Sequence, residues 1–122
     1  KMKKSGWKNK IKKRCQDAGT YRSEFEEPIS TLADILEKRD AINEEYKRLG
    51  SKPVIVYTNK GGASNPTKNP LLILWSDLNQ QALAYWRDLG LTPAGLKKLN
   101  EDALKGQNKS ALARVLEDLD KI

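Results

Sequence analysis

The chain has 122 residues, of which 23 are Lys or Arg, 16 are Asp or Glu and none is His, so its formal net charge is +7. With one Cys and no His, it cannot form an internal disulfide, a Cys/His zinc site or a nucleophile activated by a neighbouring imidazole. No stretch approaches the ~18 consecutive apolar residues of a membrane-spanning helix, so no membrane partner is expected. A chain of this length supports one hydrophobic core, which predicts a single domain over 1–122.

The first 14 residues hold most of the excess positive charge, since they include eight Lys or Arg side chains and no acid. Trp7, Ile11 and Cys15 recur every four residues, a spacing that predicts a basic N-terminal arm or helix over 1–18. Such an arm attracts nucleic acid, because each phosphate that it neutralises releases counterions. A solvated tail and a helix lying on a membrane surface are the alternatives. The candidate DNA contacts are Lys3, Lys4, Lys8, Lys10, Lys12, Lys13 and Arg14.

A long helix is predicted over 20–50. Two signals compete for its start, because Ser23 and Glu26 have the spacing of a capping box while Pro28 prefers the first helical position. The helix therefore begins between 21 and 28. Its apolar stripe drifts around the helix along its length, which predicts contacts with more than one neighbour.

Residues 51–69 are predicted to form an extended loop, because Gly and Pro interrupt them repeatedly. The run at 54–58 is rich in β-forming residues, so a short strand there is compatible with the sequence, and its partner could come from another subunit. Ordered loops of this length are usually functional. Lys60 and Lys68 are second-rank DNA-contact candidates in this loop.

A helical hairpin is predicted over 70–105, because an Asn or Thr followed by Pro opens a helix at Pro70 and again at Pro93. Gly106 is expected to end the second helix, and a separate C-terminal helix follows over 109–122. The fold class is therefore all-α. One helix carries apolar residues in steps of three and four, which is typical of a helix-packing seam. The seam residues predicted to form an oligomer interface are Leu71, Trp75, Leu78, Tyr85 and Trp86.

No group of residues has a spacing typical of a catalytic or metal-binding site. Many acidic residues occur as sequence neighbours, such as Glu44 and Glu45, and neighbours on a helix point about 100° apart, so they cannot share one metal ion. Cys15 belongs to the apolar stripe of the basic helix and is interpreted as a packing residue. We therefore expect no catalytic residue, no metal site and no cofactor.

Three ordered motifs resemble the small subunit of the terminase of tailed phages, in particular the large family found in many long-tailed phages and prophages. The resemblance extends from about Thr20 to about Lys105, and one departure is Ala94-Gly95 where the family has a Ser and a base. The residues that carry it are Tyr57, Thr58, Asn59, Lys60, Gly61 and Gly62, then Lys68, Asn69 and Pro70, then Leu89, Gly90, Leu91, Thr92 and Pro93.

The resemblance implies a non-catalytic protein that binds double-stranded phage DNA as a homo-oligomeric ring, in the cytoplasm of the bacterial host. It also implies a partner, the terminase large subunit, which carries the ATPase and nuclease and is recruited and regulated by the small subunit. The alternative is a dimeric helix-turn-helix transcription regulator, with the turn at 90–93 between its two helices and Lys97, Lys98 and Asn100 as the plausible base readers.

Overall fold

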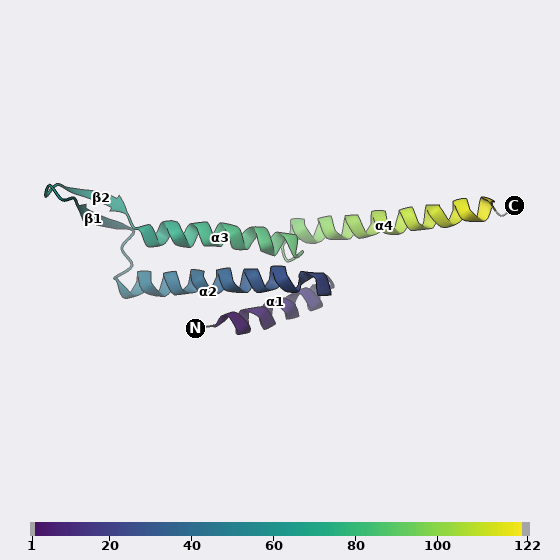
Figure 1. Ribbon diagram of the computed structural model, residues 1–122, viewed down its shortest axis with the longest axis horizontal. Helices are drawn as coiled ribbons and strands as arrows, with labels where there is room; N and C mark the ends of the chain where they lie inside the picture. The colour runs from purple at the N-terminus through teal and green to yellow at the C-terminus, as the bar shows by residue number, and fades with distance from the viewer. Residues whose placement is uncertain (1, 121–122) are drawn as a thin grey trace.

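The structure is a computed structural model that describes residues 2–120, without the side chains of residues 107–111. Within this part of the chain it consists of four α-helices, one short 3₁₀ turn and one antiparallel β-hairpin (Figure 1). The all-α class predicted from the sequence is confirmed, with a small sheet added. In chain order the elements are α1 (Lys4–Ala18), η1 (Ser23–Phe25), α2 (Glu26–Arg48), β1 (Val54–Thr58), β2 (Ser64–Lys68), α3 (Pro70–Asp88) and α4 (Pro93–Asp120).

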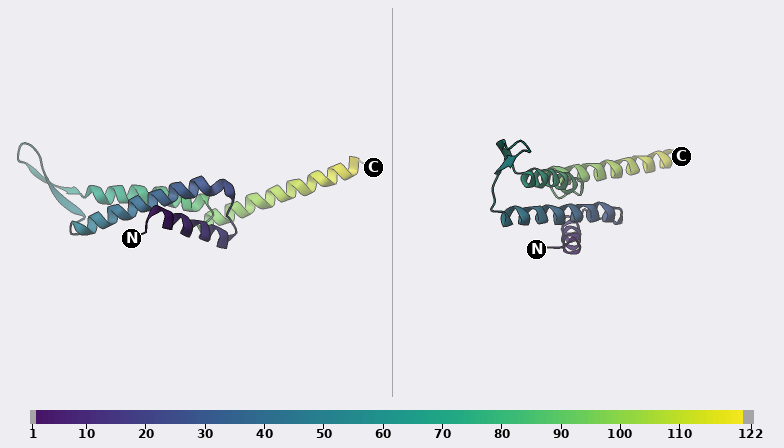
Figure 2. Two further views of the ribbon diagram at one scale, coloured as in Figure 1. Left: turned by 60° about the horizontal axis from the view of Figure 1, so that its bottom comes forward. Right: turned by 60° about the vertical axis from the view of Figure 1, so that its left-hand side comes forward.

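The long helix α2 lies between α1 and α3, which pack on opposite sides of it (Figures 1 and 2). Its buried residues are Ile29, Leu32, Ala33, Ile35 and Leu36, and together they form the centre of the hydrophobic core. Helix α1 contributes Ile11 and Cys15 to this core. On the opposite side of α2, Ala82 of α3 and Leu89 at the end of α3 complete it. The drifting apolar stripe of α2 therefore does contact two neighbours, as the sequence predicted. The start of α2 at Glu26 also falls within the predicted window.

The strand predicted at 54–58 is present as β1, but its partner is β2 of the same chain and not a strand of another subunit. The register runs from Val54 opposite Lys68 to Thr58 opposite Ser64. The composition of β2, Ser-Asn-Pro-Thr-Lys, contains little that favours a strand, so its neighbour and the turn decide its conformation. The turn is closed by Asn59, whose side-chain oxygen accepts a hydrogen bond from the Ala63 N–H at 3.0 Å, and by Gly62 at φ +84°.

Pro66 fits into β2 without removing a ladder hydrogen bond. Asn69 N–H donates to the Pro53 carbonyl and Asn59 N–H donates to the Ala63 carbonyl, both at 2.9 Å. Hydrogen-bonded and non-bonded pairs alternate in an antiparallel ladder, so the pair of Val56 and Pro66 is a non-bonded one. The nitrogen of Pro66 therefore faces away from β1, at the outer edge of the hairpin.

Two predictions about the C-terminal half were wrong. Residues 70–105 do not form a helical hairpin, because α4 leaves the end of α3 and continues in nearly the same direction (Figure 1). The predicted break at Gly106 is also absent, since α4 runs through it to Asp120. A glycine inside a helix costs roughly 1 kcal/mol relative to alanine, which weakens a helix without ending it. Residues 121 and 122 of the predicted helix over 109–122 lie outside the described residues.

The junction of α3 and α4 is a tight elbow, which we define as residues 87–99. Thr92 caps α4, as the sequence predicted, because its hydroxyl accepts a hydrogen bond from the Gly95 N–H at 3.1 Å. Gly95 itself lies against the last turn of α3, so closely that a Cβ atom on it would be 1.9 Å from the carbonyl oxygen of Arg87. The glycine that replaces the family's expected residue at this turn therefore permits a close backbone contact.

We expect Gly95→Ala to lower the free energy of unfolding by about 1–3 kcal/mol, because its methyl group meets backbone that cannot move aside easily. Gly106→Ala is the matched control, since Gly106 lies in the same helix with no atom within 4 Å of an added Cβ. That variant should be neutral or gain up to about 1 kcal/mol of helix stability. Thermal and denaturant unfolding of both variants measures the difference, and equal effects of the two substitutions would contradict the close contact.

Candidate nucleic-acid interface

Helix α1 is docked on the body of the protein along its length. Ile11 and Cys15 are fully buried against α2, and the Trp7 indole Nε1–H donates a hydrogen bond to the Asp40 carboxylate at 3.1 Å. At the start of the helix, the backbone N–H of Lys4 donates to the Glu37 carboxylate at 2.6 Å. The alternative of a solvated tail therefore does not describe residues 4–18. The basic side chains of α1 instead project from a fixed helix.

The seven basic residues predicted to contact DNA in this helix and its N-cap fall into two sets. Lys4, Lys8 and Lys12 are half-buried beside α2, because they lie near the side of the helix that carries Ile11. The other set is exposed and lies on the outward part of the helix, where steps of three and four residues bring Lys10, Lys13 and Arg14 together. We call this exposed set the α1 basic row, which consists of Lys3, Lys10, Lys13 and Arg14.

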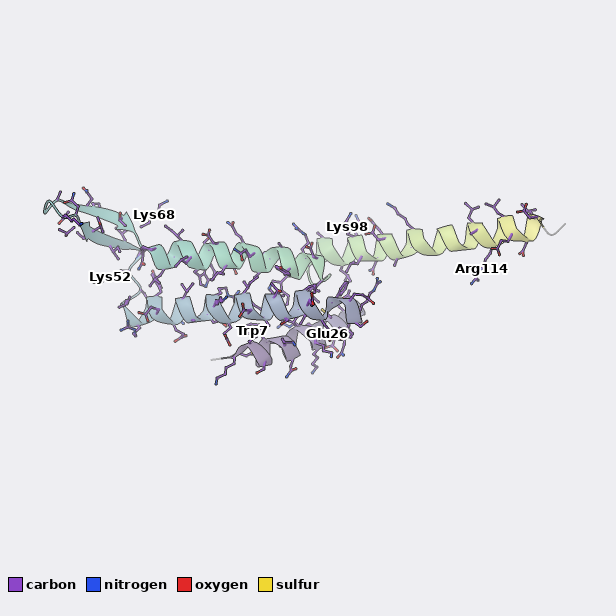
Figure 3. The ribbon with its side chains drawn as sticks, in the orientation of Figure 1. Trp7, Glu26, Lys52, Lys68, Lys98 and Arg114 are labelled. Atoms are coloured by element: carbon purple, nitrogen blue, oxygen red, sulfur yellow. The ribbon has the colours of Figure 1, made fainter. Side chains whose placement is uncertain are left out.

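Lys12 is the residue of the predicted set that is most engaged within the chain. Its ammonium group lies 3.2 Å from the Glu26 carboxylate and 5.1 Å from the centre of the Tyr21 ring. The Tyr21 hydroxyl donates a second hydrogen bond to the same carboxylate. This cluster joins α1, through Lys12, to Glu26 at the start of α2 (Figure 3), with Tyr21 contributed by the segment between the two helices.

The cluster shifts the acid–base behaviour of each of its members. The hydrogen bonds from Tyr21 and Lys12 lower the pKa of Glu26, with a further contribution from the charges of Lys12 and Lys8. The same contacts raise the pKa of Lys12, chiefly through its hydrogen bond to Glu26. The hydrogen bond to Glu26 also raises the pKa of Tyr21. Lys12 is consequently a charged group whose charge is already compensated within the chain, which makes it a weaker phosphate contact than its exposed neighbours.

Two members of the α1 basic row rest against aromatic rings. The Lys10 ammonium lies 5.2 Å from the centre of the Trp7 ring, and the Arg14 guanidinium lies 6.0 Å from the Trp86 ring of α3. These are cation–π contacts of the charged groups themselves, and because both residues are exposed, the charges also remain accessible to water.

Lys60 and Lys68 lie on the β-hairpin, at the other end of the helical body from the docking site of α1 (Figures 1 and 3). Both are exposed. The structure therefore does not bring them together with the α1 basic row. It adds Lys52, which the sequence analysis missed, at the base of the same hairpin. The sequence feature that could have identified Lys52 is its position in a stretch without acidic residues.

The five residues predicted to form an oligomer interface lie against other parts of the same chain. Leu78, Tyr85 and Trp86 pack against the hydrophobic core. Leu71 and Trp75 line a groove between α3 and the end of α2, opposite Ile42 and Tyr46. All five are only half-buried, so each retains surface that a second copy can contact, and their role in an oligomer stays a prediction.

The part of the chain that the structure describes shows no constellation typical of catalysis. No three of its Asp, Glu or Cys side chains converge where a metal ion could bind. Cys15 is buried, and this burial raises the pKa of its thiol, which disfavours the reactive thiolate. None of the described helices combines the length and the apolar character needed to cross a membrane.

Protonation of Glu26 tests whether the cluster holds α1 in place. The pKa of Glu26 is lower in the folded protein than in the unfolded chain, so its contribution to stability is complete above about pH 5. It is lost as the pH falls through the folded-state pKa. We therefore expect Glu26→Gln to destabilise the protein at pH 7 and to flatten the decline of its melting temperature below pH 5. Glu27→Gln is the matched control, because it removes one negative charge at an exposed neighbour, and identical pH profiles for both variants would contradict the assignment.

Comparison with known proteins gives one match. The model of a protein family described as phage terminase, small subunit, matches residues 4–105, which include α1, α2, the hairpin, α3 and the elbow. Searches of curated proteins and of solved structures return no match. Since the family match covers most of the chain, this protein belongs to the phage terminase small-subunit family, which serves the packaging of phage genomes.

Proposed function

We propose that this chain is the non-catalytic DNA-binding component of a phage packaging terminase. It binds duplex phage DNA, assembles into a homo-oligomeric ring, and recruits and regulates the large subunit that carries the ATPase and nuclease. It acts in the cytoplasm of the bacterial host, encoded by a phage or prophage. The family match supports the packaging role, and the α1 basic row carries the proposal that this chain itself contacts DNA.

The α1 basic row suits contact with phosphates. Its four charges stand on one docked helix and its N-cap, so the backbone that carries them needs no ordering when DNA arrives. Contacts of this kind fix the position of the protein on the duplex without reading its sequence. We rank Lys3, Lys10, Lys13 and Arg14 above Lys4, Lys8 and Lys12, because the second set is partly covered by α2.

Exposed apolar side chains support the proposed assembly. A ring needs two different complementary surfaces on each copy, whereas a dimer needs one surface that pairs with itself. The described residues expose large apolar side chains both near the hairpin and along α4. Outside the hairpin strands they include Ile73, Leu74, Leu83, Leu104, Leu112, Val115, Leu116 and Leu119. These residues offer the surfaces for contact with further copies or with the large subunit.

The alternative of a helix-turn-helix regulator finds no support in the elbow. That motif requires its two helices to cross at a steep angle so that the second lies in the DNA groove. Here α4 continues beyond α3 in nearly the same direction (Figure 1). The Lys97 ammonium also lies 3.9 Å from Glu101 on the next turn of the same helix.

We expect substitution of Lys3, Lys10 and Lys13 by Ala to weaken binding to duplex DNA. For each phosphate that the variant no longer neutralises, the slope of log K against log salt should fall by about 0.9. The measurement is fluorescence anisotropy with a labelled duplex at five or more salt concentrations. Lys97→Ala, Lys98→Ala and Lys105→Ala together are the matched control, because they remove three exposed positive charges from α4. If the control lowers affinity as much as the α1 variant, only net charge matters and the assignment of the basic row is wrong.

Native mass spectrometry distinguishes the packaging subunit from the regulator. The packaging proposal predicts an assembly of many copies, formed with or without DNA, whereas the regulator predicts a dimer. A monomer or dimer at every concentration tested would overturn the ring.

A further inference from the structure

A long stretch around the hairpin is free of acidic residues. From Tyr46 to Ser76 the chain contains no Asp or Glu but five bases, in a protein with 16 acids in total. The helical part of this stretch includes an ion pair between Arg48 and Glu45, which lies just before it. The bases of the hairpin are Lys52, Lys60 and Lys68, and the ion pairs found within the described residues do not include them.

The hairpin projects beyond the ends of α2 and α3 into solvent (Figures 1 and 2). Apart from the half-buried Ile55, all its strand residues are exposed, and Val56 and Tyr57 are exposed to 70% and 62%. Lys52 and Lys68 lie at its base and Lys60 lies in its turn. An isolated two-stranded hairpin is marginally stable in water, so this exposed hairpin would gain stability from a ligand that covers it.

We propose that the β-hairpin of residues 52–68 is a second DNA-contact element, separate from α1, that enters the major groove of the duplex. The inference rests on the proposed function, since it takes DNA as the ligand. A two-stranded antiparallel ribbon fits the major groove, which is about 12 Å wide. The three lysines at the two ends of the ribbon then meet phosphates at the groove edges.

The two faces of the ribbon carry different groups. Alternation along the strands places Tyr57, Asn65 and Thr67 on one face, beside the half-buried Ile55, where they can exchange hydrogen bonds with base edges. The opposite face carries Val54, Val56 and Pro66, which suit apolar contact such as that with thymine methyl groups, together with the polar Thr58, Ser64 and Lys68. The hairpin thus combines charge for affinity with side chains that can distinguish bases, whereas the α1 basic row offers charge alone.

The edges of the hairpin disfavour its use as a strand-pairing surface between copies. Pro66 offers no N–H at the outer edge of β2. The outer edge of β1 is open, but an antiparallel second β1 centred on Val56 would place Lys52 opposite Lys60 of the other copy at both ends. Like charges at these positions repel, so the hairpin surface is better matched to a polyanion than to itself.

The test is DNA binding by the variant Lys52→Ala, Lys60→Ala, Lys68→Ala, measured in the full chain over a salt series. Within the described residues these side chains make no hydrogen bond or ion pair, so the hydrogen bonds that shape the hairpin, such as the one at 2.9 Å between the hydroxyls of Thr58 and Ser64, do not depend on them. We expect weaker binding and a slope of log K against log salt that is smaller by up to about 2.7. The control is again the triple Ala variant at Lys97, Lys98 and Lys105, which should keep the wild-type slope.

A second measurement tests entry into the groove directly. Dimethyl sulphate methylates guanine N7, which faces the major groove, so bound wild-type protein should protect guanines that the hairpin variant leaves reactive. Absence of N7 protection with the wild-type protein would overturn the groove contact.

The outcomes separate this inference from the proposed function. If the α1 variant weakens binding while the hairpin variant binds like the wild type, the hairpin inference falls and the proposed function stands. If the wild-type chain shows no salt-dependent DNA binding, both the hairpin inference and the proposed function are overturned. If the hairpin variant forms smaller assemblies in native mass spectrometry, the hairpin is a self-association element and the inference is overturned.

Discussion

The burial of α2 on two sides is the constraint on which the rest of this structure depends. Leu32 and Leu36 are removed from water only because α1 and α3 cover opposite sides of the same helix. A polar contact spans the same three helices. The Asp40 carboxylate accepts a hydrogen bond from Trp7 of α1 at 3.1 Å and pairs with Arg39 at 3.2 Å, while Arg39 donates to Asn79 of α3 at 3.1 Å. Because this contact is directional, it sets how α1 and α3 are placed along α2, and so which lysines point outward.

The helices were predictable because periodicity and caps act locally. Asn69 caps α3 with a 3.0 Å hydrogen bond from the Leu71 N–H, and the composition around it is enough to expect that. β2 could not be predicted, because Ser-Asn-Pro-Thr-Lys becomes a strand only when β1 lies beside it. The continuity of α4 through Gly106 was not predicted either. Glycine is typical of helix ends, but nothing in the surroundings of Gly106 ends this helix.

The location of the candidate site was predictable from composition, but the contacts of its individual lysines were not. The density of lysine in α1 identified the region, but whether Lys12 is free depends on Tyr21 and Glu26, which the chain brings back to it after a turn. Sequence spacing within α1 does not report that contact. The same limit applies to the apolar seam on α3. Its spacing is the same whether the helix packs against a neighbour in the same chain or against another copy of the protein. In this structure the half-buried residues of the seam lie against the rest of their own chain.

The length of α4 has a mechanical consequence. Its 28 residues form a rod of about 42 Å that packs on the end of α3 at the elbow, and Leu112, Val115, Leu116 and Leu119 beyond it are exposed. For a rod of that length, a tilt of about 10° at the elbow moves the far end by about 7 Å. The close packing of Gly95 on Arg87 lies at the base of this rod, so it fixes the direction in which the rod points. A small change in the contact between two helices becomes a displacement at the tip as large as the width of a side chain.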